Sequence, residues 1–169
     1  MKYIDTSVIL AALDPLDPRQ KPAREILERN EDKVISELVI LELASVLTRR
    51  EILKKLKRKL GLREELILPT VLLYLMKRFK LCYGKANGHL KIPELGELYT
   101  PIATAISISQ KLRLKTLDLL HVAYAKVLKI RGESIDTLIT ADEDLANKVI
   151  KELDIRVEVL KKNISQKGL

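Results

Sequence analysis

Short apolar segments alternate along the chain with longer segments in which apolar residues recur every three or four positions. The first pattern is typical of buried strands and the second of amphipathic helices. Four segments are short and apolar enough to be strands, and the first three lead directly into residues that can begin a helix. The predicted strands are 2–4, 33–36, 137–140 and 156–159.

The segments between these strands predict helices, which prolines and glycines separate. Pro15 and Pro18 follow the first helix, and Gly61 ends the third. Residues 82–93 contain two glycines, an asparagine and a proline, and this composition predicts a loop. The predicted helices are 6–13, 19–29, 37 through the basic residues before Gly61, 64–80, 99–113, 117–130 and 142–153.

The alternation of strands and helices determines the expected architecture. Successive strands joined by helices run parallel, and their right-handed connections place helices on both faces of the sheet. The sequence therefore predicts an α/β fold, a three-layer α/β/α sandwich with a central parallel sheet and a helical, basic insertion in the middle of the chain. With 169 residues, we expect a single domain over 1–160, with 49–95 as a basic helical and loop extension within it and 161–169 as a basic tail.

The positive charge of the chain is concentrated in its middle. The formal net charge is +8, and between Arg49 and Lys91 there are 13 lysines and arginines but only three acids. Such a segment can contact RNA phosphates, or it can be a solvated helix face. The densest run, a weak candidate for RNA binding, is Arg49, Arg50, Lys54, Lys55, Lys57, Arg58 and Lys59.

Composition argues against several classes of protein. The single cysteine, Cys82, excludes an internal disulfide and any CxxC zinc or redox motif. The six glycines do not have the spacing of a dinucleotide-binding loop or a P-loop. The early apolar stretch 8–13 is too short for a membrane span or a secretory leader, so we expect a cytoplasmic protein without a membrane partner.

Two aspartates come directly after predicted strands. Asp5 ends the first strand, and Asp142 follows the strand 137–140. Ligand sites in parallel sheets lie beyond the carboxyl ends of the strands, so both side chains are expected at the same edge. Asp144 is a spare candidate in the same turn. Asp136 starts its strand, so it is expected at the opposite edge and is excluded.

Two further acids lie within apolar helices. Glu42 is the only charged residue in 38–47 and has no cation three or four residues away on its own helix. Asp118 lies in the first turn of 117–130, with His121 one turn later. A carboxylate among apolar residues is costly unless it is paired, protonated or bound to a cation. Four such carboxylates meeting at one point would form an all-oxygen site for Mg²⁺ or Mn²⁺.

Each of these residues also has a structural interpretation. Asp5 and Asp142 can be helix N-caps, and Asp118 can interact favourably with its helix dipole. His121 is more readily interpreted as a hydrogen-bonded core residue than as a metal ligand. Glu42 fits a structural role least well, because it lies several residues beyond the start of its helix.

Four short motifs, in this order, resemble those of the PIN-domain nucleases, the family that includes the VapC toxins of toxin-antitoxin pairs. The resemblance covers about 1–48 and 98–160, whereas the middle of the chain is longer and more basic than in a compact toxin. In the second motif the resemblance favours Glu42 over Glu37 as the metal-site acid. The motifs are Tyr3-Ile4-Asp5-Thr6-Ser7, the segment 36–44, the segment 118–123 with its aspartate and histidine, and Thr140-Ala141-Asp142.

This resemblance implies a metal-dependent (Mg or Mn) endoribonuclease, with water as the nucleophile and an antitoxin protein as a possible partner. One or two Mg²⁺ or Mn²⁺ ions would be held by the catalytic acids Asp5, Glu42, Asp118 and Asp142. The expected supporting residues are Thr6, Ser7, His121, Thr140 and Asp144.

Two alternative functions remain open from the sequence. A phosphatase with an aspartyl nucleophile usually has a second aspartate two residues after the first, but Ser7 occupies that position. A PIN-like protein that binds RNA without cutting it, as a scaffold or within a protein complex, would retain the same acids as structural residues.

Self-association is also expected. The apolar segments 66–76 and 102–112 offer more nonpolar surface than one thin sandwich can cover. We therefore expect a homodimer or a higher oligomer.

Overall fold

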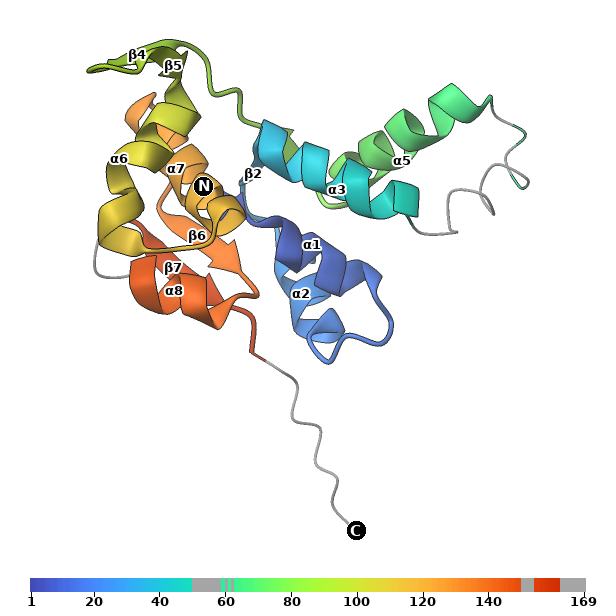
Figure 1. Cartoon of the computed structure of the whole chain (residues 1–169). Coiled ribbons are helices and arrows are strands. Elements are labelled where there is room, and N and C mark those ends of the chain that lie inside the picture. Colours follow the sequence, from blue (N-terminus) through green and yellow to red (C-terminus); the bar gives the residue numbers. More distant parts are fainter. Residues whose placement is uncertain (50–58, 60, 62, 150–153, 162–169) are drawn as a thin grey trace.

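A parallel sheet of five strands, in the order β3-β2-β1-β6-β7, forms the centre of the molecule. The computed structural model describes residues 1–49, 59, 61, 63–149 and 154–161 (Figure 1). The strands are β1 (Lys2–Ile4), β2 (Lys33–Ile35), β3 (Leu81–Tyr83), β6 (Thr137–Thr140) and β7 (Arg156–Val159). The four predicted strands are confirmed, and β3 is an additional one.

The first strand is the centre of this sheet. In β1, Tyr3 lies opposite Val34 of β2 on one side and Leu138 of β6 on the other. All three side chains are buried, because helices cover both faces of the sheet at this point. The carboxyl ends of β1 and β6 therefore lie side by side at one edge of the sheet.

In the part of the chain that the structure describes, four helices connect the strands on one side of β1. The helices α1 (Thr6–Leu13) and α2 (Gln20–Glu28) lie between β1 and β2, and α3 (Glu37–Arg49) and α5 (Glu64–Arg78) lie between β2 and β3. Contacts join α1 to α2 and α3 to α5. The pair α3 and α5 extends away from the sheet to one side of the molecule (Figure 1). The predicted passage of the third helix through 50–58 lies outside the described residues.

The remaining helices belong to the second half of the sheet. The helices α6 (Thr100–Leu112) and α7 (Thr116–Ile130) precede β6, and α8 (Glu143–Val149) joins β6 to β7. Right-handed connections put them on the face opposite α1, α2, α3 and α5. The α/β/α sandwich predicted from the sequence is confirmed. Among the described helices, none is both long and apolar enough to span a membrane.

The loop predicted over 82–93 is wrong. The first residues of this segment complete β3, and its end forms β4 (His89–Ile92), which pairs with β5 (Gly96–Tyr99) as an antiparallel hairpin. Gly88 and Gly96 adopt positive φ angles at the ends of these strands. Glycines in this part of the sequence therefore mark the ends of hairpin strands rather than a continuous loop.

Gly84 lies directly after β3, where α7 approaches β2. A Cβ atom at this position would lie 2.7 Å from Cγ2 of Val34 and 2.9 Å from Cδ1 of Leu128. Both neighbours are almost completely buried, so neither can move into free space. Glycine is therefore required here by packing rather than by a positive φ angle.

We expect Gly84→Ala to lower the free energy of unfolding by about 1–3 kcal/mol, because the added methyl group overpacks the contact between α7 and β2. Urea unfolding followed by circular dichroism measures this difference. Lys85→Ala is the matched control, since Lys85 is exposed at the next position. Equal unfolding midpoints for Gly84→Ala and wild type would show that the contact tolerates a Cβ atom.

Candidate active site

A pocket of about 210 Å³ opens at the carboxyl edge of the sheet, beyond β1 and β6. All four acids predicted from the sequence line it, together with hydroxyl residues, one histidine and three aliphatic side chains. Asp144 is not part of this lining, and its carboxylate lies 2.9 Å from Nζ of Lys148. The lining residues are Asp5, Thr6, Ser7, Leu10, Glu42, Val46, Leu117, Asp118, His121 and Asp142.

Asp5 connects β1 to α1. It is the N-cap of α1, because its Oδ1 accepts a hydrogen bond from the backbone N–H of Ser7. Its Oδ2 accepts hydrogen bonds from the hydroxyls of Ser7, at 2.7 Å, and Thr140, at 2.6 Å. The side chain is almost fully buried. The capping role and the pocket position expected for Asp5 therefore occur together.

Asp142 is held in a similar way at the end of β6. Its Oδ1 accepts hydrogen bonds from the backbone N–H groups of Asp144 and Leu145, so it caps α8. The Thr140 hydroxyl accepts from the Asp142 N–H while donating to Asp5. The Ser7 hydroxyl likewise accepts from the N–H of Ala141. Two hydroxyl groups thus connect the ends of β1 and β6 and fix the two aspartates relative to each other.

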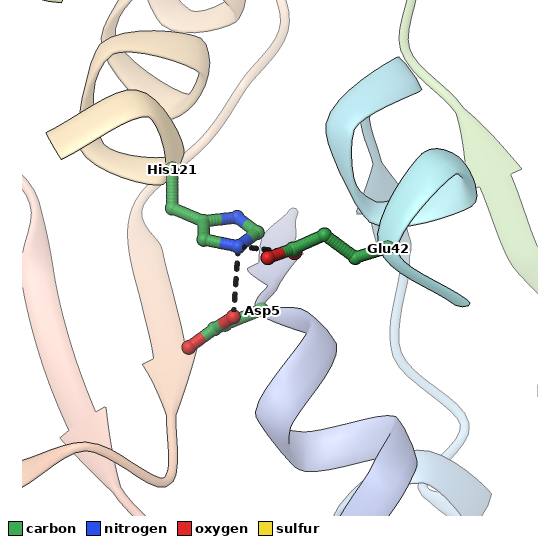
Figure 2. Close-up of side chains that lie close together, drawn as sticks. All are labelled: Asp5, Glu42 and His121. Atoms are coloured by element: carbon green, nitrogen blue, oxygen red, sulfur yellow. Dashed lines mark hydrogen bonds and ion pairs between the residues drawn. The ribbon is translucent and has the colours of Figure 1, made fainter. Parts of the chain in front are cut away.

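Glu42 reaches the same pocket from α3. Its Oε2 lies 2.8 Å from Nε2 of His121, on α7, and it accepts a hydrogen bond from the Thr6 hydroxyl. The same His121 nitrogen lies 3.2 Å from Oδ1 of Asp5. Figure 2 shows the three side chains converging from α3, α7 and the start of α1. One ligand atom from each of Asp5, Glu42 and His121 lies within 4.8 Å of the others.

These contacts shift the pKa values of Glu42 and His121 in opposite directions. Burial raises the pKa of Glu42, but hydrogen bonds from His121 and Thr6 lower it by more than burial raises it. The net shift of the Glu42 pKa is therefore downward. Burial lowers the pKa of His121, but the carboxylates of Asp5 and Glu42 raise it more, so the net shift is upward. Glu42 is therefore paired, with a partner on a different helix from its own.

Two residues behind His121 were not identified as site residues from the sequence. The buried Tyr3 hydroxyl lies 3.2 Å from Nδ1 of His121 and 2.8 Å from Oγ of Ser36. Tyr3 thus holds the Nδ1 edge of the His121 ring, while Nε2 faces the carboxylates. The sequence could have indicated this contact, because Tyr3 lies in a short buried strand and a buried tyrosine hydroxyl needs a hydrogen-bond partner.

Asp118 lies in the first turn of α7 and lines the same pocket. Burial, followed by the negative charges of Asp142 and Asp5, raises the pKa of its carboxyl group. The raised pKa indicates that the charged form of Asp118 is disfavoured in the folded protein, so a cation beside it would be favourable. The oxygen-rich donor set, with one imidazole, fits Mg²⁺ or Mn²⁺.

Three other sequence predictions concern residues away from the pocket. Glu37 accepts a hydrogen bond from the Tyr99 hydroxyl and does not line the pocket. Of the predicted basic run, Arg49 and Lys59 are described and exposed, whereas Arg50, Lys54, Lys55, Lys57 and Arg58 lie outside the described residues. Asp136 lies at the amino end of β6, where it pairs with the N-terminal amine.

Comparison with known proteins gives a family-model match over part of the chain and a fold shared with solved structures. The PIN domain family model matches residues 2–78. The crystal structure of VapBC2 from Rickettsia felis bound to a promoter DNA fragment is 15% identical, with a TM-score of 0.56 over 95% of this chain and 100% of that chain. The structure of VapBC-1 from nontypeable Haemophilus influenzae is also 15% identical, with a TM-score of 0.52 over 95% of this chain and 98% of that chain. No curated protein matches the sequence. The resemblance to PIN domains is thereby confirmed.

The opposite pKa shifts of Asp118 and Glu42 predict opposite effects on stability in EDTA. At neutral pH, Asp118→Asn raises the melting temperature, because it removes a carboxylate whose charge is unfavourable in the folded state. This gain disappears as the pH falls through the raised pKa of Asp118. Glu42→Gln lowers the free energy of unfolding by about 1–2 kcal/mol, because it weakens a charged hydrogen bond.

Thermal and urea unfolding between pH 3 and pH 7 measure both effects. The Glu42→Gln loss is present above the ordinary glutamate pKa and shrinks as the pH falls through the lowered one. A destabilised Asp118→Asn at neutral pH, or an unchanged Glu42→Gln, would contradict this description of the pocket.

Proposed function

From this PIN fold and its acidic pocket, we propose that the protein is a metal-dependent endoribonuclease that hydrolyses RNA phosphodiester bonds, and that it acts as the toxin of a toxin-antitoxin pair. The observation that carries the proposal is the convergence of Asp5, Glu42 and His121, with ligand atoms within 4.8 Å. Asp118 and Asp142 line the same pocket. A divalent cation would compensate the charge of four carboxylates in so small a volume.

Each side chain has a distinct part in this proposal. Asp5, Glu42, Asp118 and Asp142 hold one or two Mg²⁺ or Mn²⁺ ions. A bound ion would neutralise charge on the scissile phosphate and lower the pKa of an attacking water. Thr6, Ser7 and Thr140 keep the carboxylates oriented through their hydroxyl hydrogen bonds. His121 fixes Glu42 and Asp5 through Nε2. We assign the fourth position to Asp142 rather than to Asp144, which pairs with Lys148.

RNA affinity must come largely from outside the pocket. None of the ten lining residues is a lysine or an arginine. We therefore propose that the basic run beginning at Arg49 contacts phosphates along the strand, as its charge predicts. Chemistry and affinity would then depend on different parts of the chain.

The proposed partners are an antitoxin protein and a second copy of the chain. Both similar structures are named as VapBC assemblies. Apolar side chains are exposed on the two helices expected to support self-association, Leu73 and Tyr74 on α5 and Ile102 and Ile106 on α6. A PIN-like scaffold that binds RNA without cutting it is the second candidate, because Asp5 and Asp142 also serve as helix caps.

Cleavage by single variants tests the proposed nuclease. We expect wild type to cut single-stranded RNA with Mg²⁺ or Mn²⁺ and to stop in EDTA. Asp5→Asn should lower the rate by about 100-fold or more, since even partners of metal ligands contribute about 10–100-fold. Asp144→Asn is the matched control, because its carboxylate lies outside the pocket. The assay follows a labelled oligoribonucleotide on a denaturing gel.

Three results would count against a metal-dependent nuclease. They are undiminished cleavage in EDTA, full activity of a folded Asp5→Asn, and RNA binding by wild type without metal-dependent cleavage. The last would favour the scaffold function.

Sedimentation velocity tests self-association. At micromolar concentration we expect a species of about twice the 19.2 kDa chain mass, because pairing would cover exposed apolar groups. Replacing Leu73 and Tyr74 with lysine should shift the distribution toward the monomer if α5 forms the interface. A single 19.2 kDa species for wild type would contradict the predicted dimer.

A further inference from the structure

Three aliphatic side chains line the acidic pocket beside its carboxylates. They are Leu10 on α1, Val46 on α3 and Leu117 on α7. Leu117 immediately precedes Asp118 and is 50% exposed. The pocket lining thus combines carboxylates with three aliphatic side chains from three separate helices, here called the aliphatic wall.

The protein core does not account for this wall. Leu119 and Leu120, on the same helix as Leu117, pack against the hydrophobic core of the described residues. Leu117 and Val46 do not belong to that core in the part of the chain that the structure describes, whereas Leu10 packs at its margin. Two of the three aliphatic groups are therefore free to contact a molecule that enters the pocket.

Charge limits what that molecule can gain from the rest of the pocket. Among the described residues, the lining contains four acids and no lysine or arginine, so these residues offer the phosphates of RNA no fixed cationic side chain. In the proposed nuclease, however, the scissile phosphate lies at these carboxylates. The ribose and base next to it must then face the remaining lining, of which the aliphatic wall is the nonpolar part. The flat face of a nucleobase is the nonpolar surface of a nucleotide.

We propose that Leu10, Val46 and Leu117 form an aliphatic platform that packs against the nucleobase adjoining the scissile phosphate. This inference rests on the proposed nuclease function. Packing against a base face does not read hydrogen-bond donors and acceptors, so the platform gives little preference among the four bases. It does require a base that is not stacked in a duplex. The platform therefore selects single-stranded or looped RNA and positions the phosphate over the carboxylates.

The test combines one protein change with one substrate change. The substrate is a short oligoribonucleotide whose cut site is mapped with wild type, and in two further versions one nucleotide flanking the cut is abasic. Leu117→Ala removes most of the wall on α7. Ile130→Ala is the matched control, because Ile130 is a 73% exposed aliphatic residue at the other end of the same helix.

On the intact RNA, Leu117→Ala should lower kcat/KM roughly five- to tenfold, mainly through KM, since an aliphatic side chain contributes to binding in proportion to the apolar area it buries. With one of the two abasic substrates, kcat/KM of wild type should fall by a similar factor. For Leu117→Ala, the same abasic substrate should lower kcat/KM no further than the substitution already does. Ile130→Ala should match wild type on every substrate. Titration with Mn²⁺ alone should give the same affinity for all three proteins, which separates base contact from damage to the metal site.

The remaining outcomes identify what has failed. Wild-type kinetics for Leu117→Ala on the intact RNA overturn the platform and leave a partner protein's side chain as the occupant of the wall. A loss in Leu117→Ala that is equally large on intact and abasic RNA also overturns it, because the side chain then acts on something other than the base. If wild type shows no metal-dependent cleavage, the proposed function fails and this inference fails with it.

Discussion

The site depends on the contact of His121 with the carboxylates of Glu42 and Asp5. One imidazole nitrogen lies 2.8 Å from Glu42 and 3.2 Å from Asp5, and it thereby joins α7 to α3 and to the start of α1. The ring is almost fully buried, as is Asp5. Without the imidazole between them, these carboxylates would face each other in a poorly solvated space, where like charges repel. The raised pKa of His121 follows from their proximity.

The sheet makes this meeting of residues possible. Adjacent parallel strands end at the same edge, so Asp5 and Asp142 follow β1 and β6 and share the hydroxyl of Thr140. Helix capping fixes the backbone around each of them, which leaves their carboxylates at defined positions. Asp118, by contrast, has a raised pKa, because burial and the negative charges of Asp142 and Asp5 disfavour its charged form. The pocket therefore has one compensated side, at Glu42, and one side where a cation would be favourable.

Local sequence patterns predicted the strands and helices of the molecule but not the contacts between residues far apart in the chain. Strand ends placed Asp5 and Asp142 correctly, because the edge position of a residue after a parallel strand follows from topology alone. The partner of Glu42 could not be found on its own helix, since His121 lies 79 residues further along the chain. The hairpin of β4 and β5 was missed because its glycines and proline lie at its ends and turn. The sequence did not indicate that Leu117 lines the pocket, because an exposed leucine and a core leucine cannot be distinguished in an apolar helix.

Anomalous scattering from a crystal soaked in Mn²⁺ tests the central claim most directly, because it locates the ion without reference to activity. The account predicts a strong anomalous peak among the carboxylates of Asp5, Glu42, Asp118 and Asp142, and its loss in an Asp5→Asn crystal. A well-ordered pocket with no peak at saturating Mn²⁺, or a peak only at other acids such as Asp136 and Asp154, would contradict it.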